Sequence, residues 1–157
     1  MEGVELKDMH SFDKAACINK RKRVGRDAAF ADAKTAVFEA KMRKRAADDA
    51  VRDGTGGAAA AEEAAADVES SVEKAALVAA IISNKAIEKA ARTANDEIAA
   101  YINGSDLKQA SRKHAKALTD AQAAAGVAVD YAGKIGGSVT MSLPFSEMPL
   151  FHVRSGD

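Results

Sequence analysis

The sequence predicts an all-α protein: an elongated antiparallel helical hairpin or three-helix bundle, alanine-rich and coiled-coil-like, that ends in an extended C-terminal arm. Three observations predict this class. Residues 58–102 contain neither proline nor glycine. Apolar residues recur at intervals of three and four along each long segment, which is the period of an amphipathic helix. Two short polar stretches containing glycine, 53–57 and 103–106, divide these segments.

Alanine accounts for 37 of the 157 residues, which is half of all the hydrophobic residues. A buried alanine methyl contributes only about 0.8 kcal/mol, against about 1.5–3 kcal/mol for a buried leucine or phenylalanine. The core is therefore thin for a chain of this length. We expect an elongated shape and additional stabilisation from self-association or from a partner. A GC-rich genome also favours alanine codons, and the sequence leaves that explanation open.

The first predicted helix follows a short irregular segment, residues 1–11, and is capped by Ser11 or Asp13. Its apolar positions repeat with helical spacing at Phe30, Ala33, Val37 and Ala40. Gly25 costs about 1 kcal/mol in a helix interior. Two versions remain open: one continuous helix to about residue 52, which we favour, or a break at this glycine.

The glycines of residues 53–57 predict a reversal of the chain, so that the first two helices run antiparallel. Residues 14–45 hold eleven basic and three acidic residues, a net charge of +8. Residues 48–73 hold eight acids and one arginine, a net charge of −7. We therefore predict ion pairs between the helices, with Lys44 and Arg45 opposite Asp67 and Lys41 opposite Glu69, which would select the antiparallel arrangement.

The second predicted helix shows one apolar stripe in its first half and a second stripe toward its end. The first stripe comprises Val68, Val72, Ala75, Ala79, Ile82 and Ala86, and the second comprises Ile87, Ala91, Ala94, Ile98 and Tyr101. A helix with two apolar stripes packs on two neighbours. We therefore expect a third helix against this second half, after the turn at 103–106, and the helical domain to span residues 12–136.

The last segment, residues 137–157, contains both prolines of the chain and a set of large apolar residues. Residues that precede proline favour extended backbone, so this segment is predicted as an extended arm. Its candidate anchors for a partner are Leu143, Phe145, Met148, Leu150 and Phe151. Either the arm packs on its own helices or it docks on a neighbouring subunit, and the sequence does not distinguish the two.

Two basic clusters are candidates for contact with a polyanion. They comprise Lys20, Arg21, Lys22, Arg23 and Arg26 in the first cluster, and Lys41, Arg43, Lys44 and Arg45 in the second. Such runs also occur as solvated helix surface or as targeting signals. The zero net charge of the chain and the absence of aromatic residues within the first run weaken a nucleic-acid interpretation.

No motif for catalysis, phosphate binding or metal binding is present in the sequence. The three histidines are far apart, and the glycine-rich stretches lack the lysine and the preceding strand of a phosphate-binding loop. The single cysteine, Cys17, is expected to be a small buried side chain. We predict a protein without catalytic residues, cofactor or metal, and no apolar run long enough to span a membrane.

The favoured hypothesis is a non-enzymatic structural subunit of a larger assembly, formed with copies of itself or with other subunits. A virion or phage particle is the specific assembly that we suggest. The alternative is a helical nucleic-acid-associated protein that uses both basic clusters. The N-terminus resembles neither a secretory signal nor a mitochondrial presequence, so a soluble intracellular location or a place within a particle is expected.

Overall fold

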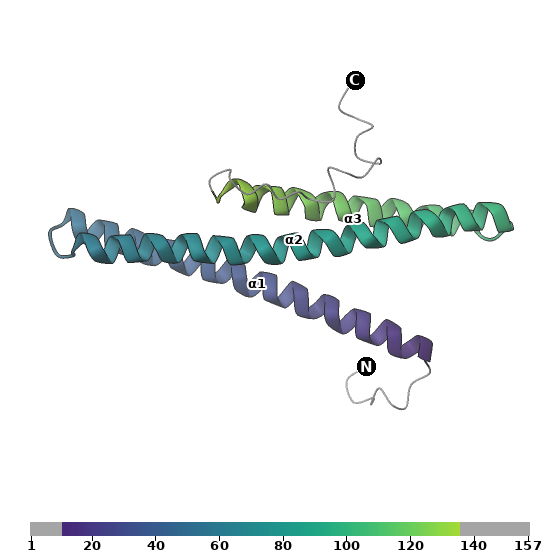
Figure 1. Ribbon diagram of the computed structural model, residues 1–157, viewed down its shortest axis with the longest axis horizontal. Coiled ribbons are helices and arrows are strands. Elements are labelled where there is room, and N and C mark those ends of the chain that lie inside the picture. The colour runs from purple at the N-terminus through teal and green to yellow at the C-terminus, as the bar shows by residue number, and fades with distance from the viewer. Residues whose placement is uncertain (1–10, 136–157) are drawn as a thin grey trace, which may run out of the picture.

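The computed structural model describes residues 11–135, and this part of the chain consists of three α-helices (Figure 1). They are α1 (Ser11–Arg52), α2 (Ala58–Asn103) and α3 (Leu107–Gly133). Between residues 11 and 135 there is no β-strand, which confirms the predicted all-α class. The proposed C-terminal arm with its anchors, and the segment 1–10, lie outside the described residues.

In the two connections, glycine residues end α1 and α2, and an aspartate caps the start of α3. Gly54 and Gly104 both have positive φ angles, 74° and 65°, which a residue with a Cβ rarely adopts. A Cβ on Gly56 would lie 2.8 Å from that of Ala50, so this turn also requires a small residue there. Asp106 caps α3, and its side chain accepts a hydrogen bond of 3.0 Å from the backbone of Gln109.

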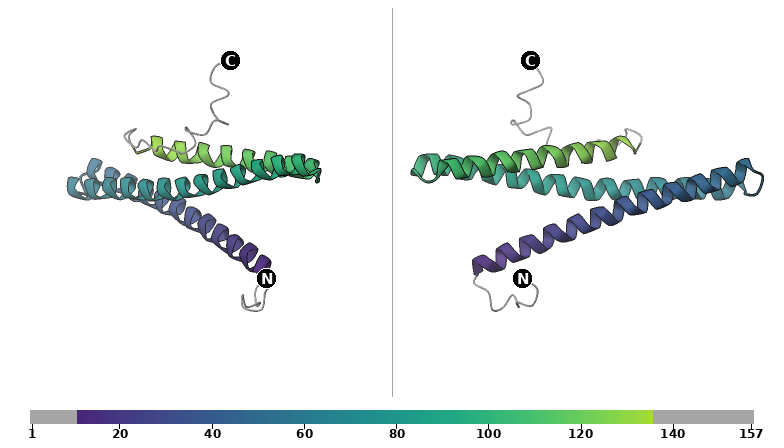
Figure 2. Two further views of the ribbon diagram at one scale, coloured as in Figure 1. Left: turned by 45° about the vertical axis from the view of Figure 1, so that its right-hand side comes forward. Right: turned by 180° about the vertical axis from the view of Figure 1, so that it is seen from behind.

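The three helices are not packed together along their whole lengths. α1 and α2 lie side by side near the turn that joins them and then diverge toward the N-terminal end of α1 (Figures 1 and 2). α3 runs back along α2 from the turn that joins them and reaches Val72. α1 itself continues through Gly25 without a break.

All three helices meet at one junction near the middle of the molecule. Val37 of α1 packs there on Val72 and Ala75 of α2, and Tyr131 near the end of α3 packs against them. The Tyr131 ring also meets the ring of Phe30 edge to face, with 5.7 Å between the ring centroids. This junction is where both neighbours of α2 are in contact with it.

A seam of small side chains joins α2 to α3. From α3 it buries four alanines at helical spacing, Ala117, Ala121, Ala125 and Ala128. They are accompanied on α2 by buried Ile87 and Ala90. Ser83 of α2 is also fully buried, and its hydroxyl has no hydrogen-bond partner among residues 11–135. Small side chains of this kind allow two helix axes to approach closely.

Two polar contacts link α2 to α3 near the turn that connects them. Ser111 donates a hydrogen bond of 2.5 Å to Glu97. Thr93 Oγ1 lies 3.1 Å from His114 Nδ1 and donates its own proton to the backbone oxygen of Ala90 at 2.9 Å.

The predicted ion pairs between α1 and α2 do not form, and this prediction was wrong. Lys44 instead pairs with Asp48 of its own helix, with 2.6 Å between Nζ and Oδ2. Arg52 likewise pairs with Asp49 and Asp53. Within the described part of the chain no ion pair joins two helices, and those that form lie within one helix or at its end.

The second stripe of α2 is only partly covered by α3. Ile87 is buried against α3, but Ile98 and Tyr101 are 58% and 75% exposed, and Ile102 beside them is 72% exposed. The reason is geometric. α3 covers one side of α2, and these three side chains lie on the other side of its last two turns.

Candidate functional site

The residues along one stripe of α1 change from apolar to mostly polar and basic toward the N-terminus. Phe30, Ala33, Val37 and Ala40 continue toward the N-terminus, at the same spacing of three and four, through Arg26, Arg23, Asn19 and Ala16. The apolar half of this stripe packs on α2 at the junction. The other half is polar and basic, and it lies where α1 has diverged from α2 (Figure 1).

The opposing face of α2 is basic as well. Lys85, Lys89 and Arg92 follow one another at positions i, i+4 and i+7, which places them on one side of the helix. Between the two helices lies a groove of about 690 Å³, which we call the basic groove. Twelve residues line it: Ala16, Asn19, Lys20, Lys22, Arg23 and Arg26 from α1, and Lys85, Glu88, Lys89, Arg92, Thr93 and Asp96 from α2.

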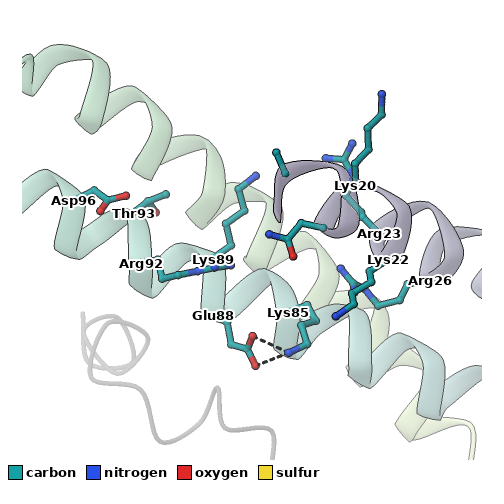
Figure 3. A pocket seen from close by; sticks show the side chains of 12 residues that line it. Lys20, Lys22, Arg23, Arg26, Lys85, Glu88, Lys89, Arg92, Thr93 and Asp96 are labelled. Atoms are coloured by element: carbon teal, nitrogen blue, oxygen red, sulfur yellow. Dashed lines mark hydrogen bonds and ion pairs between the residues drawn. The ribbon is translucent and has the colours of Figure 1, made fainter. Parts of the chain in front are cut away.

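The groove carries a large positive excess, since seven of its lining residues are basic and two are acidic. Figure 3 shows Lys22 and Arg26 extending from α1 toward α2, where Lys85 and Glu88 are hydrogen-bonded to each other. That ion pair, 2.9 Å between Nζ and Oε2, is the one pair among the groove residues within the described chain. Six basic side chains therefore remain without a carboxylate partner among residues 11–135.

Glu88 itself is held in its charged form by its surroundings. The hydrogen bond from Lys85 lowers the pKa of the Glu88 carboxyl, and the positive charges of Lys85, Arg92 and Arg26 lower it further. The carboxyl is fully exposed, so solvent screens these interactions. Even with Glu88 ionised, the groove keeps its positive excess at neutral pH.

Like charge on both walls explains why α1 and α2 separate here. Cationic side chains that face each other across a helix interface repel, and burying them without partners costs several kcal/mol for each ion. Packing this part of α1 onto α2 would require both. The helices instead remain apart, and water reaches the charged groups.

The structure separates the two basic clusters that the sequence suggested. Four members of the first cluster, Lys20, Lys22, Arg23 and Arg26, line the groove. None of the second cluster, residues 41–45, does so, because it lies near the turn between α1 and α2, where Lys44 pairs with Asp48. The second cluster therefore lies outside the groove.

Sequence reasoning missed the contribution of α2 to the groove. Lys85, Lys89 and Arg92 look like ordinary solvated helix positions when α2 is considered alone. The antiparallel alignment of α1 and α2 does indicate that these three residues face the groove. If residues with numbers summing to about 111 face each other, as Val37 and Val72 do approximately, then Arg23 and Arg26 face the region of Lys85 and Lys89.

No group of three or more histidine, cysteine or acidic side chains within residues 11–135 is arranged to hold a metal ion. Cys17 is buried, as expected.

The comparisons with known proteins identify no relative. No protein-family model matches the chain, and no curated protein or solved structure is significantly similar to it. No helix within residues 11–135 is both long enough and apolar enough to cross a lipid bilayer. A functional conclusion must therefore come from the surfaces of the molecule itself.

Proposed function

We propose that the protein is a non-enzymatic structural subunit, which assembles with copies of itself through surfaces that the single chain leaves exposed. The observation that carries this proposal is that the buried apolar side chains are mostly small, while many large ones are exposed. Of fifteen buried hydrophobic residues, eleven are alanine, and the larger aliphatic ones are Val37, Val72 and Ile87. Thirteen large hydrophobic residues of the described chain are exposed.

The most concentrated exposed patch lies at the end of α2. Ile98, Tyr101 and Ile102 are spaced i, i+3 and i+4, so their side chains form one continuous surface, which we call the apolar end. Leu77 with Ile81 on α2, and Phe38 with Met42 on α1, are further exposed pairs at i and i+4. Contiguous apolar surface of this kind is typical of protein interaction sites. A particle such as a virion is the kind of assembly that we suggest.

Nucleic-acid association is the second candidate, and the basic groove is the observation that favours it. Six unpartnered basic side chains in one groove suit a polyanion. Against it stand the zero net charge of the chain and the separation of residues 41–45 from the groove. We therefore place it second.

The assembly proposal is tested by sedimentation velocity and native mass spectrometry of the full chain, from low to high micromolar concentration. The wild type is expected to self-associate. The double variant Tyr101→Ser/Ile102→Ser should weaken association by at least about tenfold, because each lost apolar contact is worth about 1.5–3 kcal/mol when fully buried and 1.4 kcal/mol corresponds to a factor of ten.

The control is Gln122→Ser/Ala123→Ser, two exposed positions on α3 away from the apolar end, which should leave association unchanged. Circular dichroism of every variant checks that the helices are retained. A wild-type protein that stays a folded monomer at high micromolar concentration would overturn the proposal.

A further inference from the structure

The basic groove has the properties of a binding site for a negatively charged helix. Both of its walls are helices, their charged faces diverge, and no aromatic residue lines the space between them. Proteins that bind single-stranded nucleic acid by stacking use aromatic side chains for the bases. A helix needs none, because paired charges along two or three turns set its position.

We propose that the groove receives the acidic first half of α2 from a second copy of this chain. This inference rests on the proposed function and names the contact that joins the copies. The acidic segment, as we call it, comprises Glu62, Glu63, Asp67, Glu69 and Glu73. All five side chains are exposed, and none forms an ion pair with another residue of the described chain.

The charges of the two surfaces match in sign, in number and in spacing. The groove has five more basic than acidic side chains, and the segment offers five carboxylates. Lys85 and Arg92 are seven residues apart, as are Glu62 and Glu69. Two helices with the same seven-residue interval keep opposite charges in step over two turns.

The contact must form between molecules. Glu62 and Lys89 lie on the same continuous helix, and 27 residues at 1.5 Å each separate them by about 40 Å. A rigid helix cannot fold one onto the other. Each copy therefore carries a basic groove and an acidic segment that cannot neutralise each other.

Such a contact is head to tail, because each copy uses a different surface from that of its neighbour. A heterologous contact of this type leaves a free groove at one end and a free acidic segment at the other, so it continues into a ring or a filament. Charge complementarity of this kind mainly fixes the orientation and the partner, while apolar contacts supply most of the affinity.

The test uses two full-length variants with reversed charges. The groove-reversed variant is Arg23→Glu/Arg26→Glu/Lys89→Glu, and the segment-reversed variant is Glu62→Lys/Glu69→Lys/Glu73→Lys. Each alone should associate at least about tenfold more weakly than the wild type in sedimentation velocity, because like charges placed opposite each other at an interface cost several kcal/mol. Circular dichroism verifies that each remains helical.

Mixing the two variants in equal amounts should restore association. The negative groove of one then meets the positive segment of the other, and the unchanged groove meets the unchanged segment. The control is Lys108→Glu/Arg112→Glu/Lys113→Glu on exposed positions of α3, which has the same net charge as the groove-reversed variant. On its own it should associate like the wild type. Mixed with the segment-reversed variant, it should bind that variant only through the unchanged groove of the variant, so the variant should end the assembly and not extend it.

The possible results separate this inference from the proposed function. If the wild type associates but the groove-reversed variant behaves like the α3 control, the inference is wrong and the assembly proposal stands. If the wild type is monomeric, both are wrong. If a labelled single-stranded oligonucleotide binds the wild type at low salt and not the groove-reversed variant, while self-association is unaffected by the reversal, the groove is a nucleic-acid site and the inference is overturned.

Discussion

α2 has two neighbours, and the two contacts differ in kind. Toward α3 it presents small apolar side chains, and the helices stay close over the length of α3 (Figure 2). Toward the N-terminal half of α1 it presents Lys85, Lys89 and Arg92, and the helices diverge. Both neighbours are long and regular, so helix propensity does not distinguish them. The side chains at the facing positions decide whether a helix pair closes or opens.

The largest expected effect comes from replacing the charged side chains between α1 and α2, which diverge, by apolar side chains like those between α2 and α3, which stay close. In the variant Arg23→Leu/Arg26→Leu/Lys89→Leu the repulsion is removed, and α1 should close onto α2. Each leucine that becomes fully buried adds about 1.5–3 kcal/mol to the free energy of unfolding. Urea unfolding measures the gain.

Spin labels at Ala15→Cys and Asn95→Cys, in a Cys17→Ser background, measure the separation of the helices, which should shorten in this variant. Leucines at Lys108, Arg112 and Lys113 of α3 provide a control with the same change in composition, and they should leave the distance as it is. An unchanged distance in the groove variant would show that charge is not what keeps the helices apart.

The next test weakens the packing between α2 and α3. Ile87→Ala removes the largest buried side chain between α2 and α3, and it should lower the free energy of unfolding by about 2–5 kcal/mol. The matched control is Leu77→Ala on the same helix, where the side chain is 66% exposed and the change should be within about 0.5 kcal/mol in dilute protein. If the two substitutions lowered the free energy of unfolding equally, the packing of Ile87 between α2 and α3 would be contradicted.

The smallest expected effect concerns Glu88, which lines the basic groove between α1 and α2. Because Lys85 lowers its pKa in the folded protein, the ion pair contributes stability at pH values above the ordinary glutamate pKa. That contribution is lost as the pH falls through the lowered value. A carboxyl carbon titration by NMR should place the Glu88 pKa below its ordinary value in the wild type.

In Lys85→Met the Glu88 pKa should move back toward its ordinary value, while Lys108→Met, far along the chain, should not change it. A pKa that is the same in the wild type and in Lys85→Met would exclude the hydrogen bond as the main cause. The expected change in total stability is small, since the group is exposed to solvent.

Much of the fold was predictable because it depends on local signals. The glycine-containing stretches 53–57 and 103–106 marked the ends of the first two helices, and Gly54 and Gly104 there have positive φ angles. The apolar spacing of Phe30, Ala33, Val37 and Ala40 marked the first helix. These features depend on residues within a few positions of one another. The all-α class followed from them without knowledge of any long-range contact.

The groove and the ion pairs were not predictable in the same way. The two walls of the groove come from segments at least 59 positions apart, and helical periodicity does not say whether facing residues touch. For Lys44, the choice between Asp48 one turn away and Asp67 on another helix depended on distance in space. Ile98 and Tyr101 fitted an apolar stripe, but only the direction of α3 determined that they stay exposed.

The alanine seam between α2 and α3 has a mechanical consequence. A row of identical small side chains looks almost the same after one helix slides past the other by a single turn, about 5.4 Å. Such a seam holds the helices close but does not fix their alignment. The alignment depends on contacts at the two ends of α3. At its start these are the short turn at Gly104 and the Ser111–Glu97 and Thr93–His114 contacts. At its far end the packing of Tyr131 against Val72 and Phe30 holds α3 in place, so a substitution of this one side chain would act on the alignment of the whole helix pair.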